Sequence, residues 1–167
     1  MKGKRVGSYR VLLVCMGNIC RSPAAEIVVR TLAKNAGLAS FIEVDSAGTH
    51  AYHEGEAPDP RVRKAAAKRS YDLSGLRARR LIEADFERFD RVLAMDRQNL
   101  AFMYRLCPPE LHSKIGLFLD FAPEEPEEEI PDPYYGGPEG FERVLDLCEL
   151  AGRGLIETIA GRTKNRP

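Results

Sequence analysis

The chain has 167 residues, of which 44% are hydrophobic and 30% charged, the composition of an ordinary folded globular protein. Lysine plus arginine and aspartate plus glutamate number 25 each, so the formal net charge is zero and neither a nucleic-acid partner nor a membrane surface gains support. The longest apolar run, Val11 to Met16, is far too short to cross a bilayer.

Length and cysteine usage predict the domain organisation and the compartment. We expect a flexible lead-in over residues 1–9 and a single domain over residues 10–167. The basic first ten residues are not followed by the apolar segment of a secretory signal peptide. The four cysteines are expected to stay reduced, and together these features predict a cytoplasmic protein.

The first half of the chain predicts a strand, a loop, a helix and a second strand. The apolar run Val11–Val14 is typical of a strand buried on both faces. A tight loop over 15–21 leads to a helix over 22–36, with Ser22 as N-cap and the following proline at the first helical position. Residues 41–44 form the second predicted strand, and this βαβ unit implies a parallel sheet. Ligands bind such sheets at the carboxyl ends of the strands, where the loop lies.

The rest of the chain predicts further elements at regular intervals. In order they are a loop, two helices, a strand, a helix, a strand, a long loop and a helix: 45–57, 59–69, 83–88, 92–95, 97–106, 115–119, 122–137 and 138–160. The last helix has one apolar face that should pack on the sheet. The predicted fold class is therefore α/β, a single-domain three-layer sandwich with a four-stranded parallel sheet flanked by helices.

The loop over 15–21 has the features of an anion site built around a thiol. It enters a helix N-terminus, where backbone N–H groups and the helix dipole favour negative charge. The same surroundings favour the thiolate of Cys15, the form in which sulfur is a nucleophile. Arg21, six positions later, offers a planar fork for two phosphate oxygens that carry charge during phosphoryl transfer. This chemistry needs neither a metal nor a cofactor.

A nucleotide-binding turn, with Cys15 as a buried small residue, is the alternative for this loop. Neither nucleotide fingerprint, G-x-G-x-x-G or G-x-x-x-x-G-K-[ST], is present in the chain. The strand before the loop and the Ser-Pro helix start after it therefore favour the thiol-centred anion site.

Two other groups of residues have less specific explanations. His50 and His53 are three positions apart, but no Cys or carboxylate completes a ligand set, so they are expected at the surface or in a pocket wall. From Arg61 to Arg80 there are eight lysines or arginines and one acid, Asp72. A solvated basic face explains this stretch better than a docking patch.

The nine residues C-M-G-N-I-C-R-S-P, starting at Cys15, resemble the signature loop of the low-molecular-weight protein tyrosine phosphatases. Further matches follow in that family's order: D-S-A-G-T at 45–49, A-M-D at 94–96 and D-P-Y-Y-G-G at 132–137. The resemblance runs from Arg10 to the last helix and implies catalytic roles for Cys15 and Arg21. The phosphate-binding loop that it implies also includes Met16, Gly17, Asn18, Ile19, Cys20 and Ser22.

The resemblance also implies the groups around the loop. Asp132 becomes the predicted general acid, whereas the Asp-Pro pair alone would equally suit a simple turn. Tyr52, Tyr134 and Tyr135 are the implied pocket wall for a substrate ring, and Ser46 matches a loop-supporting position. A tyrosine kinase acting on Tyr134 or Tyr135 is a further partner that the resemblance allows.

Two positions bear on regulation and rigidity. Cys20 lies close enough to Cys15 around the loop for a redox disulfide, and a buried small residue is an equal alternative. Leu76 stands where the family often has a histidine that supports the loop asparagine, so the stiffness of the loop is in question.

The predicted function is that of a metal-independent phosphatase acting on phosphotyrosine proteins through a phosphocysteine intermediate. One alternative is an arsenate reductase of the same fold, which would need further cysteines close together beyond mid-chain. Cys107 and Cys148 lie on widely separated predicted helices and do not fit that requirement. The other alternative is a non-catalytic phosphate-binding module, against which the presence of both Cys15 and Asp132 argues.

Overall fold

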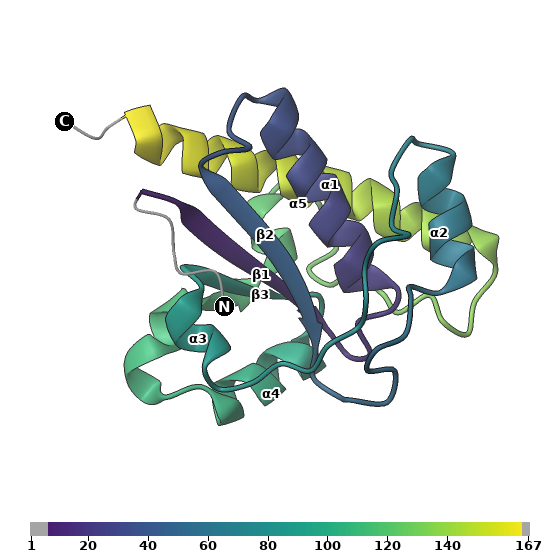
Figure 1. Cartoon of the computed structure of the whole chain (residues 1–167), viewed down its shortest axis with the longest axis horizontal. Coiled ribbons are helices and arrows are strands. Elements are labelled where there is room, and N and C mark those ends of the chain that lie inside the picture. The colour runs from purple at the N-terminus through teal and green to yellow at the C-terminus, as the bar shows by residue number, and fades with distance from the viewer. Residues whose placement is uncertain (1–6, 165–167) are drawn as a thin grey trace.

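The computed structural model describes residues 7–164 (Figure 1). Its helices and strands follow one another in the order β1 (Tyr9–Cys15), α1 (Arg21–Asn35), β2 (Ile42–Gly48), α2 (Pro60–Ala67), α3 (Asp85–Arg88), β3 (Arg91–Ala94), α4 (Arg97–Leu106), β4 (Ile115–Leu117) and α5 (Pro138–Lys164). Short 3₁₀ helices at Pro109–Lys114 and Phe118–Phe121 flank β4. Tyr9 belongs to β1, so the predicted lead-in over 1–9 extends too far, and residues 1–6 lie outside the described part.

The four strands form one parallel sheet in the order β2-β1-β3-β4, which confirms the predicted fold class. β1 pairs with a strand on each side: Val11 lies opposite Val44 of β2 and Arg91 of β3. The side chains of this strand are also fully buried on both faces of the sheet, and this explains why the run Val11–Val14 is continuously apolar.

Helices cover both faces of the sheet (Figure 1). α1 and α5 pack together on one face, and α3 and α4 lie on the other. Side chains of β1 alternate between the two layers, because successive residues of a strand point to opposite faces. Leu13 and Cys15 join the core under α1 and α5, whereas Leu12 and Val14 join the core on the α4 side.

The predicted apolar face of the last helix is confirmed, since seven residues at helical spacing are buried: Phe141, Val144, Leu145, Cys148, Ala151, Leu155 and Ile159. Two other helices are capped by the aspartate that precedes them. Asp59 accepts a hydrogen bond from the Arg61 amide at the start of α2, and Asp96 caps α4. No helix within residues 7–164 combines the length and the apolar character needed to cross a membrane.

The prediction that residues 45–57 form a loop is wrong over its first four residues. β2 continues through Asp45 to Gly48, because it pairs with β1 along its whole length and ends with Cys15 opposite Gly48. A Cβ atom on Gly48 would lie 2.7 Å from the Met16 carbonyl oxygen. Only glycine therefore lets this strand end approach the loop that follows β1 so closely.

Candidate active site

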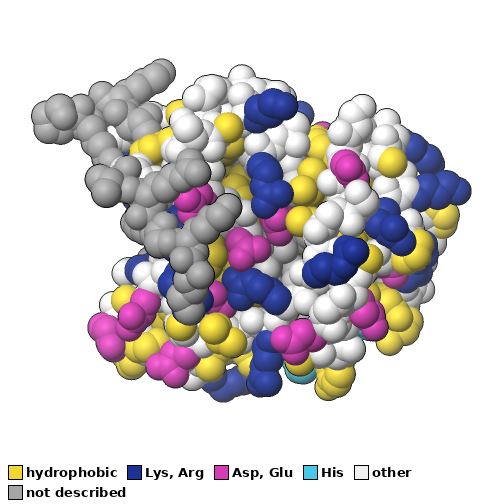
Figure 2. Space-filling view, in the orientation of Figure 1, with side chains coloured by type: hydrophobic (Ala, Val, Ile, Leu, Met, Phe, Trp, Pro, Cys, Tyr) yellow, Lys and Arg dark blue, Asp and Glu magenta, His cyan; other side chains and the backbone are white. Residues whose placement is uncertain are grey.

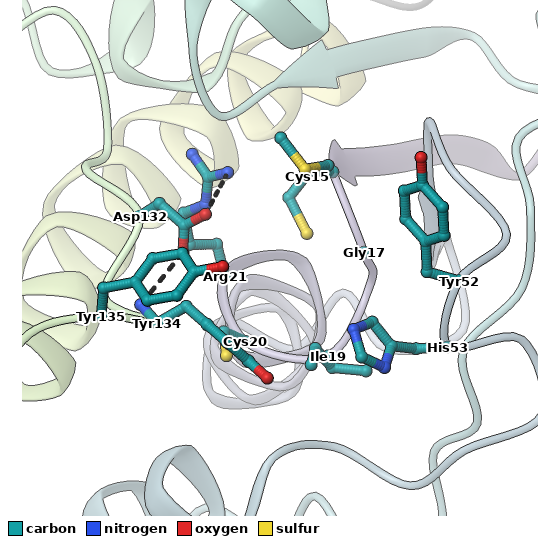
Figure 3. A pocket seen from close by; sticks show the side chains of 11 residues that line it. Cys15, Gly17, Ile19, Cys20, Arg21, Tyr52, His53, Asp132, Tyr134 and Tyr135 are labelled. Atoms are coloured by element: carbon teal, nitrogen blue, oxygen red, sulfur yellow. Dashed lines mark hydrogen bonds and ion pairs between the residues drawn. The ribbon is translucent and has the colours of Figure 1, made fainter.

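The loop between β1 and α1 forms the floor of a cavity of about 270 Å³ at the carboxyl end of the sheet. Cys15 ends β1, Arg21 begins α1, and Asn18 between them has a positive φ of 56°. The cavity is lined by side chains from three separate parts of the chain: Cys15, Met16, Gly17, Ile19, Cys20, Arg21, Tyr52, His53, Asp132, Tyr134 and Tyr135. The site residues that the sequence predicts as catalytic thus share one cavity (Figure 3).

The thiol of Cys15 lies at the bottom of this cavity and is only 3% exposed. Its Sγ is 3.0 Å from the Ser22 hydroxyl, close enough for a hydrogen bond. The sulfur points toward the centre of the cavity (Figure 3). A tetrahedral anion bound at the bottom of the cavity would therefore contact the sulfur.

The predicted N-cap role of Ser22 is wrong. α1 begins one residue earlier, at Arg21, and its N-cap residue is Cys20, which makes no side-chain capping bond. The Ser22 hydroxyl is instead engaged by the Cys15 sulfur and by the Asn18 side-chain amide, 2.8 Å away. A serine at this position can act either as a helix cap or as a hydroxyl that binds the sulfur, and only the packing of the loop determines which.

A buried hydrogen-bond network holds the loop from below. The Asn18 amide donates to the hydroxyls of Ser22 and Ser46, and its carbonyl oxygen accepts from the Arg79 backbone N–H at 3.0 Å. The Ser46 hydroxyl in turn donates to Glu26 at 2.7 Å. Ser46 thus contacts the loop asparagine, as predicted, while the parts played by Glu26 and Arg79 were not predicted. The one sequence feature that could have indicated the role of Glu26 is that a glutamate stands among the apolar residues of α1.

Glu26 is 3% exposed, and its burial raises the pKa of the carboxyl above its ordinary value despite the bonds from Ser46 and Arg30. Leu76, at the position where the family often has a histidine, packs against the core under α1 and α5. The backbone amide of Arg79 holds the Asn18 carbonyl oxygen. The loop asparagine therefore has partners for both ends of its side-chain amide without a histidine.

Replacing Asn18 should separate the two contributions of this residue. Asn18→Ala removes the amide and puts an alanine at positive φ, so the free energy of unfolding should fall by about 1–3 kcal/mol. Asn18→Gly removes the same amide without backbone strain and should unfold at a higher temperature than Asn18→Ala. Both variants should lose roughly 10- to 100-fold in kcat/KM on an aryl phosphate, because the loop is no longer held in place. A glycine variant with wild-type kcat/KM would contradict the role of the amide.

Arg21 is only 2% exposed, and its guanidinium is held in a fixed position. Nη1 donates to Asp96 Oδ2 at 2.6 Å and to the Ile130 carbonyl at 2.9 Å, and Nη2 lies 3.8 Å from Asp132 Oδ2. Burial disfavours the charged guanidinium, but the negative charges of Cys15, Asp96 and Asp132 outweigh it, so the pKa of Arg21 is raised. Asp96 therefore both caps α4 and fixes Arg21.

Asp132 lies at the rim of the cavity, with 44% of its side chain exposed. Its Oδ1 accepts a hydrogen bond from the Tyr134 backbone N–H at 3.1 Å, which orients the carboxyl group toward Arg21 (Figure 3). The long loop that carries it is held at two points before Asp132. Glu125 pairs with Arg143 of α5, and the Ile130 N–H donates to the carbonyl of Met95, the residue after β3.

The aromatic side chains form two facing walls (Figure 3). Tyr134 and Tyr135 pack edge to face with ring centroids 4.9 Å apart, and Tyr135 is 94% exposed. Tyr52, 77% exposed, stacks on His50 at 5.3 Å on the other side of the cavity. His53 belongs to that wall, and its ring centroid is 6.5 Å from that of Tyr134. A pocket wall was one of the two locations expected for the histidines. The cavity therefore has aromatic surfaces on two sides.

Cys20 lines the same cavity, but its environment differs from that of Cys15. Burial raises the pKa of the Cys20 thiol far above its ordinary value, and the nearby Asp59 carboxylate adds to this effect. All four cysteines are free thiols, and the redox disulfide of Cys20 stays a prediction. Within residues 7–164, no group of three or more His, Cys, Asp or Glu side chains is arranged to hold a metal ion.

The fold and the site together define an α/β protein whose anion-binding loop is built around a buried thiol and arginine. Residues 10–165 match the family model described as low molecular weight phosphotyrosine protein phosphatase, and the chain belongs to that family. The predicted family is thereby confirmed.

Individual relatives and structures agree with this assignment. The chain is 44% identical over 155 residues to a low molecular weight phosphotyrosine protein phosphatase of Schizosaccharomyces pombe, covering 92% of this chain and 98% of the relative. A protein tyrosine phosphatase structure from Entamoeba histolytica, with Hepes in the active site, superposes with a TM-score of 0.90 at 41% identity, covering 93% of this chain and 99% of that one. Vibrio vulnificus Wzb in complex with benzylphosphonate is a more distant match, with a TM-score of 0.79 at 27% identity over 91% of this chain and 99% of that one.

Proposed function

We propose that this protein is a metal-independent protein tyrosine phosphatase that forms a phosphocysteine intermediate. The observation that carries the proposal is the convergence of the Cys15 sulfur, the buried Arg21 guanidinium and the Asp132 carboxyl group on one cavity. Its aromatic walls suit a substrate ring, and benzylphosphonate, which the Vibrio vulnificus neighbour binds, joins such a ring to a tetrahedral anion. Phosphotyrosine has the same two parts.

In the first step the Cys15 thiolate attacks phosphorus. A sulfur–phosphorus bond forms while the bond from phosphorus to the phenolic oxygen breaks. Arg21 and the backbone N–H groups of the loop hold the equatorial oxygens, where charge accumulates. Asp132, protonated at the start, gives its proton to the departing oxygen, so that tyrosine leaves as a neutral phenol.

In the second step water hydrolyses the intermediate. Asp132, now ionised, accepts a proton from the attacking water, and the phosphorus–sulfur bond breaks to release inorganic phosphate. The Ser22 hydroxyl, 3.0 Å from the sulfur, donates to the departing thiolate. Asp132 returns to its protonated form, so every proton is accounted for over one cycle.

The geometry offers little support for arsenate reduction. That chemistry needs a relay of cysteines able to reach the first thiol. Cys107 and Cys148 belong to the cores on opposite faces of the sheet, and burial raises the pKa of Cys148. Neither cysteine is placed to transfer a disulfide from the active site to the surface.

The proposal extends to the setting of the enzyme. Its substrates would be phosphotyrosine-containing proteins in the cytoplasm, hydrolysed by a single domain that includes β1 from Tyr9 onward. Tyr135, with 94% of its surface exposed, is accessible to a tyrosine kinase, and so to a lesser degree is Tyr134. Free thiols throughout the described chain are consistent with a reducing compartment.

Trapping the intermediate tests the function directly. During turnover of an aryl phosphate in excess EDTA, acid quenching followed by mass spectrometry should detect one phosphoryl group on the peptide that contains Cys15. A phosphatase that used metal-activated water would lose activity in EDTA and show no phosphopeptide. Thiol-coupled reduction of arsenate without hydrolysis of the aryl phosphate would favour the reductase instead.

A further inference from the structure

A second cavity, of about 320 Å³, adjoins the active-site cavity and has a different character. We name it the α2 groove: one side is formed by Arg61, Lys64 and Lys68, and the other by residues 136–138 with Phe141 of α5. The three cations lie at helical spacing along one side of α2 and the residue after it. Figure 2 shows Lys and Arg side chains gathered over α2, at the right of the view.

The groove and the active-site cavity share a wall. Tyr134 and Tyr135 line the active-site cavity, and the next residues along the chain, 136–138, line the groove. Arg61 fastens this wall: its Nη1 donates to the Tyr134 carbonyl at 2.8 Å, and its guanidinium lies over the Tyr134 ring at 5.2 Å. A peptide leaving the active-site cavity over the two tyrosines therefore enters the groove.

The positive side chains on the α2 side of the groove are not all paired. Arg61 is paired with Asp59 at 2.9 Å, and at the far side the Glu142 carboxylate shares Arg69 with Asp146 and Glu149. Within residues 7–164, by contrast, neither Lys64 nor Lys68 forms an ion pair. The α2 side of the groove thus presents two unpaired ammonium groups next to the wall of the active-site cavity.

From this arrangement we propose that the α2 groove binds acidic side chains that flank the phosphotyrosine of a protein substrate. An extended peptide covers ~3.3–3.6 Å per residue, so a carboxylate roughly two to four positions from the phosphotyrosine reaches the groove. The free ammonium groups suit single carboxylates. The planar fork of Arg61, which would favour a second phosphate, is already occupied by Asp59 and Tyr134.

This inference rests on the proposed phosphatase function and gives it a substrate preference. It also revises the expectation that the basic stretch from Arg61 onward is only a solvated face. Lys64 and Lys68 are indeed exposed, but they line a cavity that adjoins the candidate active site.

Kinetics on matched substrates test the inference. Two phosphotyrosine peptides would differ only in carrying Glu or Gln on either side of the phosphotyrosine, and p-nitrophenyl phosphate would serve as a substrate too small to reach the groove. At low ionic strength the wild type should have a kcat/KM about three- to tenfold higher for the Glu peptide, because exposed ion pairs contribute modestly. At about 1 M salt the preference should disappear.

The variant Lys64→Gln/Lys68→Gln should reduce the preference to about one while leaving p-nitrophenyl phosphate hydrolysis within about twofold of wild type. The control Lys34→Gln/Arg162→Gln removes two positive charges at the C-terminal ends of α1 and α5, and should keep the preference. An equal preference in both double variants, or none in the wild type, would overturn the inference and leave the phosphatase function standing. If neither peptide nor p-nitrophenyl phosphate were hydrolysed, the phosphatase function itself would be contradicted.

Discussion

Cys15→Ser should reduce turnover of aryl phosphates by roughly 10⁴-fold or more, measured as product release at substrate saturation. A serine hydroxyl is not ionised near neutral pH, and the cationic loop cannot make it a comparable nucleophile. The substitution is nearly isosteric, and the network around Asn18 does not depend on the sulfur. The variant should therefore fold normally and fail at the first chemical step.

Binding measurements distinguish a chemical defect from a collapsed site. Inorganic phosphate should bind Cys15→Ser within about tenfold of its wild-type affinity, since Arg21 and the loop amides remain. Cys107→Ser is the matched control, because it removes a buried thiol in the core on the other face of the sheet. It should retain wild-type kcat. Substantial turnover by Cys15→Ser would exclude the phosphocysteine mechanism.

Asp132→Asn should lower kcat/KM, which reports the step that forms the phosphocysteine, about 10²- to 10³-fold for phenyl phosphate, within the usual range for loss of a general acid. Phenolate is a poor leaving group and needs a proton as it departs. p-Nitrophenolate is much more stable as an anion, so the same variant should lose far less activity on p-nitrophenyl phosphate. The leaving-group dependence, measured across a series of substituted phenyl phosphates, is the specific signature of the missing proton.

Glu124→Gln provides the matched control for Asp132→Asn. It removes one carboxylate from the exposed part of the same loop, at a residue outside the cavity lining. Its kcat/KM should equal that of the wild type for every leaving group. A uniform loss of kcat/KM across the series in Asp132→Asn would indicate that Asp132 only positions Arg21, which lies 3.8 Å away, and would contradict its role as the acid.

Much of the fold was predictable because its signals are local. The central strand β1 was recognised from a continuous apolar run, and α5 from a single apolar face repeated over several turns. The ends of elements were less predictable. β2 was expected to stop at Val44, because the four residues that follow include polar and glycine residues. Their pairing with the end of β1 extends the strand against local propensity.

Within the site, the groups with local sequence signals were predicted, and those that depend on contacts between distant segments were not. Cys15 and Arg21 lie in one short loop, where a strand end and a helix start can be read from neighbouring residues. The support from Glu26 and from the Arg79 backbone was not predicted, because both act through contacts between segments distant in the chain.

By itself, the sequence determined the α/β class, the thiol-centred loop and the family, because each depends on residues that are adjacent or periodic along the chain. Only the tertiary structure decided that the Ser22 hydroxyl meets the sulfur instead of capping α1, that Asp96 fixes Arg21, and that the basic side of α2 adjoins the aromatic wall. The reason is physical. A hydroxyl, a carboxylate or an ammonium group can form hydrogen bonds or ion pairs with several different partners, and long-range packing determines which partner lies within reach.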